Sequence, residues 1–232
     1  MAKSLDLQLY LFVAGYLVEH IGNAIMIYKL HKQKTMYGVS IDTQICLMFA
    51  AVARVFWMWD TQLTKLTISM IEIIMAVAMH AYIIFLCYQF KDTIYKGVKE
   101  KFLKSPVLIG ICLVLSLIFH PGTKGEFFFT LQMLVSFTIF LEALALLPQL
   151  QHLRQNRDPE GLTSNYLYCL GGSRGVRFFF WVAMITNNDS FWYLIVADLV
   201  HTGLLIGFFY LYRQTLKQGG GPILAFTDKK MY

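Results

Sequence analysis

Charged residues are scarce in this chain of 232 residues, because only 15% are Asp, Glu, Lys or Arg while 57% are hydrophobic. This composition, with a mean hydropathy of +0.54, is typical of a membrane protein and excludes an ordinary soluble domain. The sequence also lacks metal-ligand spacings, a glycine-rich phosphate loop and a nucleophile–base arrangement. We therefore expect no enzyme activity, no cofactor and no bound metal.

Cysteine is scarce too, and all four cysteines fall inside apolar segments, where we expect small apolar core residues rather than disulfide partners. A cleavable signal peptide is not evident. The N-terminus lacks a basic stretch, and Glu19 and His20 interrupt the first apolar run.

Seven apolar segments approach the length of about 20 residues that a helix needs to cross a bilayer. They cover residues 8–28, 41–59, 67–90, 105–119, 127–148, 164–186 and 191–212. We therefore predict an all-α membrane protein with seven transmembrane helices in residues 1–217. Residues 218–232, which begin with a glycine-rich linker, are predicted to form a flexible cytosolic tail.

The basic residues are distributed unequally between the two sides of the predicted bundle. Of the 20 lysines and arginines, three (Lys3, Lys65 and Lys124) lie on one side, three lie inside apolar segments, and the other fourteen share the opposite side. The positive-inside rule places the fourteen in the cytosol. The N-terminus is then luminal and the C-terminus cytosolic, and the net charge of +6 requires no nucleic-acid partner.

The three basic residues inside apolar segments are Arg54, Arg174 and Arg177. A charged side chain at the centre of a bilayer costs at least ~2.5 kcal/mol, so such residues face the bundle interior and by default mark a functional site. Three together predict a site for an anionic ligand. The alternative is a structural role, in which Arg54 and Arg174 pair with acidic residues of other segments, namely Glu19, Glu72 or Glu142.

Residues 27–59 and 148–181 resemble each other. When Gly–Val–Ser of the first stretch is aligned with Gly–Leu–Thr of the second, Arg54 falls opposite Arg177 without a gap. Internal repeats of this sort build transporter-like folds with a ligand site near the midplane between the halves. We therefore predict two three-helix repeats joined by a linking helix.

The motifs of the second half resemble one known family, the KDEL receptors or ER lumen protein-retaining receptors. FTIFLEALALLPQL at 137–150 and LTSNYLYCLGGSRG at 162–175 carry the resemblance, which extends at matching spacing over nearly the whole chain. It implies a seven-helix, SWEET/PQ-loop-like receptor with a luminal N-terminus. Such a receptor binds escaped ER luminal proteins in the Golgi at mildly acidic pH, through their C-terminal K/H-D-E-L tetrapeptide. It then releases these proteins in the ER.

The resemblance also assigns roles to particular residues. Arg54 and Arg174 match ligand-binding arginines, Trp181 matches a tryptophan near the binding cavity, and Glu142 matches a glutamate of the proton-linked switch. His20 lies one position from the family's histidine and is a candidate pH sensor, since histidine titrates between pH 5 and 8. The alternatives are a salt-bridge partner for Glu142 and a hydrogen-bonded core residue for His20.

Other positions depart from the family's pattern, so the preferred tetrapeptide stays open. Arginines of the family are replaced by Phe12 and Met184, aromatic residues by Ser173 and Arg177, and an aspartate by Gly207. Arg177 is either a third contact for the anion or a partner for Asp198.

The last four residues contain Lys229 and Lys230, at the fourth and third positions from the end. This pattern matches the dilysine signal that coatomer reads for return from the Golgi to the ER; the alternative is a solvated basic tail. We expect the protein to cycle between the ER and Golgi membranes.

A different class of function is a PQ-loop or SWEET-like transporter of a small metabolite or amino acid. Pro148 and Gln149 and the internal repeat favour this class. The first repeat lacks a Pro-Gln pair, however, and three arginines suit an acidic ligand better than a neutral sugar.

Overall fold

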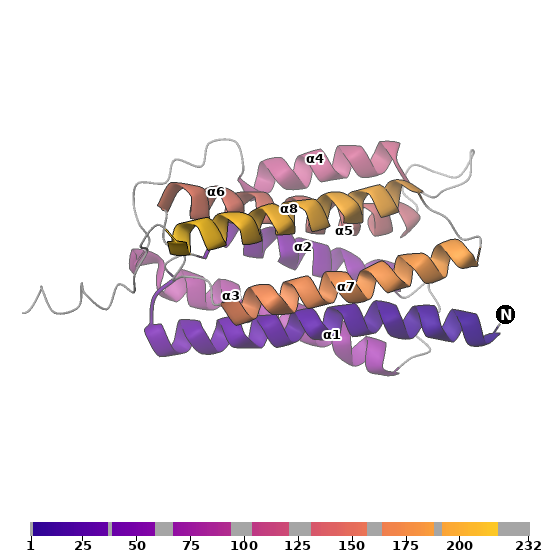
Figure 1. Ribbon diagram of the computed structural model, residues 1–232, viewed down its shortest axis with the longest axis horizontal. Helices are drawn as coiled ribbons and strands as arrows, with labels where there is room; N and C mark the ends of the chain where they lie inside the picture. Colours follow the sequence, from indigo (N-terminus) through magenta and orange to yellow (C-terminus); the bar gives the residue numbers. More distant parts are fainter. Residues whose placement is uncertain are drawn as a thin grey trace, which may run out of the picture.

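The computed structural model describes residues 2–36, 39–58, 67–93, 104–120, 131–156, 164–187 and 192–217. These residues form a bundle of helices that run along the long axis of the molecule (Figure 1). The elements are α1 (Ala2–Gln33), α2 (Ile41–Met58), α3 (Thr67–Gln89), the 3-10 helix η2 (Lys91–Thr93), α4 (Ser105–Ile118), α5 (Leu131–Leu144), α6 (Leu146–Asn156), α7 (Ser164–Thr186) and α8 (Trp192–Lys217).

The predicted all-α class is confirmed for these residues, which contain no strand. Within the described part of the chain, five helical stretches are long and apolar enough to cross a bilayer: Leu7–Gln33, Ile41–Met58, Thr67–Gln89, Met133–Gln151 and Trp192–Gln214. Helix α4 is apolar but shorter. The crossing of the bilayer by all seven segments, and the luminal position of the N-terminus, stay predictions. The predicted tail lies outside the described residues.

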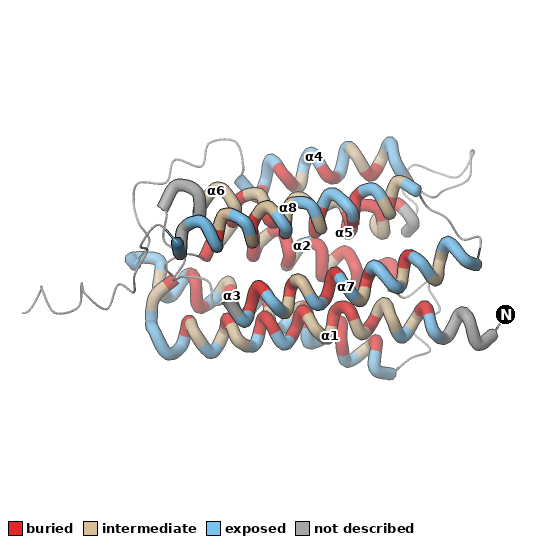
Figure 2. The backbone as a smooth tube through the Cα atoms, viewed as in Figure 1, coloured by how far each residue is buried: buried red, intermediate tan, exposed pale blue. Residues whose placement is uncertain are grey.

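The surface of the bundle has the apolar character that lipid requires. Buried residues follow the faces that the helices turn toward one another, whereas many outward positions are exposed (Figure 2). Large apolar side chains are among the exposed residues on several helices, including Ile74, Phe85, Phe178, Leu199 and Ile206. An extensive exposed apolar surface on a soluble protein would mark an interaction site, and a membrane-spanning bundle presents such a surface to lipid tails.

Several helix boundaries differ from the prediction, and α8, for example, ends at Lys217 rather than at residue 212. Helix α1 extends past the predicted segment 8–28 at both ends. The fifth segment consists of two helices, because α5 ends at Leu144 and α6 begins at Leu146. Pro148 explains the interruption, since proline has no N–H to donate to the carbonyl of residue 144 and its ring crowds that carbonyl. The second helix then continues beyond the predicted end at residue 148.

Gln149, beside that proline, fixes the start of α2. The backbone N–H of Ser40 donates to Oε1 of Gln149 at 2.8 Å. Close by in sequence, Oδ1 of Asp42 accepts hydrogen bonds of 2.7 Å from both the backbone N–H and the hydroxyl of Ser105, the first residue of α4. These contacts satisfy free N–H groups at the start of helices and hold α2 against α4 and α6.

Helices α1 and α7 lie side by side (Figure 1) and approach closely at two glycines of α1. A Cβ at Gly22 would lie 3.0 Å from Cβ of Cys169, and a Cβ at Gly15 would lie 3.2 Å from Cγ of Arg177. The two glycines are about two helical turns apart and so share one face of α1. Small residues on such a face let membrane helices pack backbone to backbone.

This close approach predicts that Gly22→Leu destabilises the bundle, because the new side chain has to displace α7. Overpacking of this kind costs about 1–3 kcal/mol, which will appear as a lower midpoint of thermal unfolding in detergent. The control is Gly110→Leu on α4, where a Cβ meets nothing within 4 Å. Equal midpoints for the two variants would show that the α1–α7 contact is not close.

Candidate functional site: a buried arginine–carboxylate network

The three arginines predicted to mark a site all lie inside the bundle. The exposed fraction of the residue is 2% for Arg54, 5% for Arg174 and 3% for Arg177. Each guanidinium contacts a carboxylate from another helix. Pairing of this sort is required, because an ion buried without a partner loses its hydration and gains nothing in return.

Arg54 of α2 is paired with Glu72 of α3. Its Nη2 lies 2.8 Å from Oε1 of Glu72, and the same oxygen lies 2.9 Å from Nε2 of His20 on α1. His20 is thus a buried, hydrogen-bonded residue that shares one carboxylate with an arginine. Of the three acidic partners predicted as alternatives for the arginines, Glu72 is the one that contacts Arg54.

Arg177 of α7 is held by Glu142 and Tyr16. Its Nη1 lies 2.6 Å from Oε2 of Glu142 on α5, and its Nη2 contacts the hydroxyl of Tyr16 on α1. That hydroxyl in turn donates to Oε1 of Glu142 at 2.9 Å. The three side chains form a closed ring of hydrogen bonds that connects α1, α5 and α7.

The ring of Tyr16 also lies against two guanidinium groups. Cζ of Arg54 is 3.5 Å and Cζ of Arg177 is 4.5 Å from the ring centroid. A desolvated cation–π contact contributes about 2 kcal/mol or more. The two arginines that the internal repeat sets opposite each other in sequence therefore contact the same aromatic ring.

Arg174 of α7 contacts carboxylates from two helices. Its Nη1 lies 3.0 Å from Oδ1 of Asp198 on α8, and its Nη2 lies 3.4 Å from Oε2 of Glu19 on α1. The same Oδ1 of Asp198 is 3.6 Å from Nη1 of Arg177. Arg177 is therefore a partner for Asp198, one of the two roles left open by the sequence.

Trp181 belongs to the same network. Its indole Nε1 donates to Oδ2 of Asp198 at 3.0 Å. The six residues predicted for the ligand site and the pH switch all lie in one connected set of contacts. They are Arg54, Arg174, Arg177, Trp181, Glu142 and His20. Lys229 and Lys230 lie outside the described residues.

Four members of the network were not predicted as site residues: Glu19, Glu72, Asp198 and Tyr16. The cost of a charge inside an apolar segment, which predicted the arginines, applies equally to the carboxylates of Glu19, Glu72 and Asp198. Tyr16 gave no such signal, because an aromatic residue in an apolar run is usual. It joins the network because α1 passes so close to α7.

The network is not saturated with hydrogen bonds. Nε and Nη1 of Arg54 and Nε of Arg174 are buried and have no partner among the described residues. A buried donor without a partner costs about 1–3 kcal/mol, more when it is charged. These donors give the site the capacity to bind a further acceptor, and a carboxylate is the acceptor that guanidinium groups bind most strongly.

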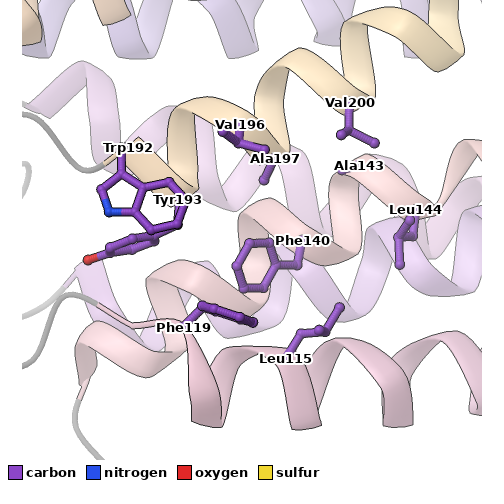
Figure 3. Close-up of a pocket in the computed structure, with 10 residues that line it drawn as sticks. All are labelled: Leu115, Phe119, Phe140, Ala143, Leu144, Trp192, Tyr193, Val196, Ala197 and Val200. Carbon is purple, nitrogen blue, oxygen red and sulfur yellow. The ribbon is translucent and has the colours of Figure 1, made fainter.

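The cavities of the bundle differ in their chemistry. A cavity of ≈ 290 Å³ between α4, α5 and α8 is lined by apolar and aromatic residues, as Figure 3 shows, and has no charged side chain in its lining. A second cavity of ≈ 450 Å³ lies between α7 and α8 and is lined in part by Arg174, Trp181 and Asp198. Of these two cavities, the one between α7 and α8 reaches the network.

The burial of these charges leads to a prediction for Glu72→Leu. The variant leaves Arg54 without its carboxylate, which should destabilise the protein by about 3–5 kcal/mol. Replacing both partners, in Arg54→Leu with Glu72→Leu, should recover a large part of this loss, because an apolar pair often substitutes for a buried ion pair. Thermal unfolding in detergent measures both variants. A double variant no more stable than the single one would contradict the pairing.

The fold and this network define a helical membrane protein with a charged interior, an arrangement typical of membrane receptors and transporters. Comparison with known proteins identifies the family. The sequence model of the family described as ER lumen protein retaining receptor matches residues 35–184. This chain belongs to that family, which by its name is a family of receptors.

Similarity to individual relatives extends over most of the chain. The ER lumen protein-retaining receptor of Dictyostelium discoideum is 32% identical, over 88% of this chain and 94% of the relative. A Caenorhabditis elegans receptor of the same name is 29% identical, over 81% and 85%. The Plasmodium falciparum receptor is 28% identical, over 93% and 96%.

Proposed function

We propose that this protein is a receptor for C-terminal ER-retention signals of the KDEL type. It binds escaped ER luminal proteins in the Golgi at mildly acidic pH and returns them to the ER, and it resides in the membranes of both compartments. The observation that carries the proposal is the buried arginine cluster with unpartnered donors in a member of this family. Retention signals of this kind are addresses read by receptors.

The chemistry of such a ligand suits the arginines. A peptide ending in Asp-Glu-Leu has two acidic side chains and a terminal carboxylate, and arginine presents a planar fork of donors to each. Arg54 and Arg174 hold the carboxylates, since both have buried donors to spare. Arg177, engaged by Glu142 and Tyr16, mainly positions the others.

The acid dependence follows from the charges around His20 and Glu142. A proton added to either group makes the network more positive, so an anionic ligand binds the protonated form more tightly. Ligand and proton then favour each other's binding, as thermodynamic linkage requires. The titratable and charged groups around this pair, on the helices that pack around it, are Tyr16, Glu19, Arg54, Glu72, His80, Arg174, Arg177, Asp198 and His201.

The Pro-Gln pair gives the transporter alternative little support. Gln149 accepts a hydrogen bond from the backbone of Ser40, which is a structural contact at the start of α2. We therefore retain the receptor as the single proposed function.

Arg54→Ala and Arg174→Ala are expected to weaken binding of a C-terminal Lys-Asp-Glu-Leu peptide by at least about tenfold each. A hydrogen bond to a charged group contributes about 1.5–3 kcal/mol, and about 1.4 kcal/mol is tenfold in affinity. Titration calorimetry of the purified protein at about pH 5.5 and about pH 7.4, on the two sides of histidine titration, gives the affinities.

The matched control is Arg213→Ala, since Arg213 is an exposed arginine at the end of α8. It should bind like the wild type, and the wild type should bind more tightly at the lower pH. Absence of acid-favoured binding of any acidic C-terminal tetrapeptide, together with uptake of a small solute into vesicles, would replace the receptor by the transporter.

For return transport, Lys229 and Lys230 are proposed as a dilysine signal for coatomer. Changing both lysines to alanine should shift the protein from the ER and early Golgi to later compartments. Fluorescence microscopy of the tagged protein and its tagged variant in cells measures this distribution. The control changes Met231 and Tyr232 to alanine, which keeps both lysines and their distance from the end. An unchanged distribution of the lysine variant rejects the signal.

A further inference from the structure

Asp198 contacts all three α7 residues of the proposed ligand site. Its Oδ1 lies 3.0 Å from Nη1 of Arg174 and 3.6 Å from Nη1 of Arg177, and its Oδ2 accepts from the indole of Trp181 at 3.0 Å. The residue is 5% exposed. One carboxylate on α8 thus makes the contacts that a carboxylate of a bound ligand would make on α7.

Asp198 is not the sole carboxylate partner of any of the three arginines. The three arginines face four carboxylates. Without Asp198, every arginine retains a partner, because Arg54 keeps Glu72, Arg174 keeps Glu19 at 3.4 Å and Arg177 keeps Glu142. Loss of Glu72 or Glu142, by contrast, removes the nearest carboxylate from Arg54 or Arg177.

The packing beside Asp198 leaves room for the residue to move. The ≈ 450 Å³ cavity between α7 and α8 is lined by Asp198 together with Arg174 and Trp181. Because Asp198 itself lines this cavity, the cavity provides space into which its carboxylate can turn away from the arginines.

We propose that Asp198 is an internal competitor that occupies the place of a ligand carboxylate and thereby determines specificity. This inference rests on the proposed receptor function. A ligand displaces Asp198 from Arg174 and Trp181 and puts its own carboxylate there. Because Asp198 is tethered beside the arginines, it competes at a high effective concentration. A peptide with one carboxylate is excluded, whereas a peptide that also engages Arg54 through a second carboxylate succeeds.

The test uses Asp198→Asn in the full-length receptor, purified in detergent, with a fluorescent peptide at about pH 5.5, below the usual pKa of histidine. Asparagine keeps the shape and an oxygen that accepts from Trp181, and it loses the charge. We expect the affinity for a Lys-Asp-Glu-Leu peptide to rise by about tenfold. The affinity for its Lys-Asn-Gln-Leu counterpart, whose only carboxylate is terminal, should rise further, so that discrimination between the two peptides narrows.

The matched control is Asp42→Asn, which alters an acidic residue that contacts Ser105 and none of the arginines. It should leave both affinities unchanged. A second readout needs no variant of Asp198: the indole 15N–H signal of Trp181, assigned with Trp181→Phe, should shift when the peptide is added to the wild type. That shift reports loss of the hydrogen bond to Asp198, and a signal that stays in place overturns the proposal.

The outcomes separate this inference from the function on which it rests. If the wild type binds the peptide and Asp198→Asn binds it equally or more weakly, Asp198 is not a competitor and the receptor function stands. If only the variant binds, Asp198 blocks the site in the wild type, so the inference holds and the proposed receptor function for this peptide falls. If neither binds any acidic tetrapeptide, the inference and the proposed function both fall.

Discussion

The structure depends on one constraint: an arginine placed inside an apolar bundle must find a carboxylate there. Arg54, Arg174 and Arg177 meet this requirement with acidic residues from four other helices, α1, α3, α5 and α8. Each pair fixes one helix against another at a particular register, because a shift by one turn of ~5.4 Å would separate the charges. The ion pairs therefore determine how the helices are arranged around the site, although pairs of this kind add little net stability.

Tyr16 links this arrangement to the packing of α1. Gly15, its neighbour, lets α1 approach α7 so closely that a Cβ there would touch Arg177. The approach places the Tyr16 ring against both Arg54 and Arg177, and its hydroxyl beside Glu142. The proposed ligand site is thus assembled by helix packing, since its donors come from α2 and α7 and are oriented by α1. If one of these residues changes its hydrogen-bond or ion-pair partner, we expect the contacts of the other residues in the network to change as well, because they share partners.

Much of this arrangement is predictable from the sequence, because charge inside an apolar segment is a strong physical signal. The cost of burying Arg54, Arg174 and Arg177 identified the site, and five of the seven apolar segments match described helical stretches that are both long and apolar enough to cross a bilayer. The pairing was not predictable. Glu19, Glu72 and Glu142 were all possible partners, and the choice among them depends on how helices distant in sequence pack. The same holds for Tyr16 and Asp198, whose roles arise only from neighbours on other helices, and for the break at Ala145, where Pro148 divides one predicted segment into two helices.

The most direct test of the account is an experimental structure of the receptor with an acidic C-terminal peptide bound at mildly acidic pH. The account predicts peptide carboxylates within hydrogen-bond distance of Arg54 and Arg174, with Glu142 still on Arg177 and Asp198 withdrawn toward the cavity between α7 and α8. A peptide bound elsewhere, with the contacts of Arg54 to Glu72 and of Arg174 to Asp198 unchanged, would contradict it.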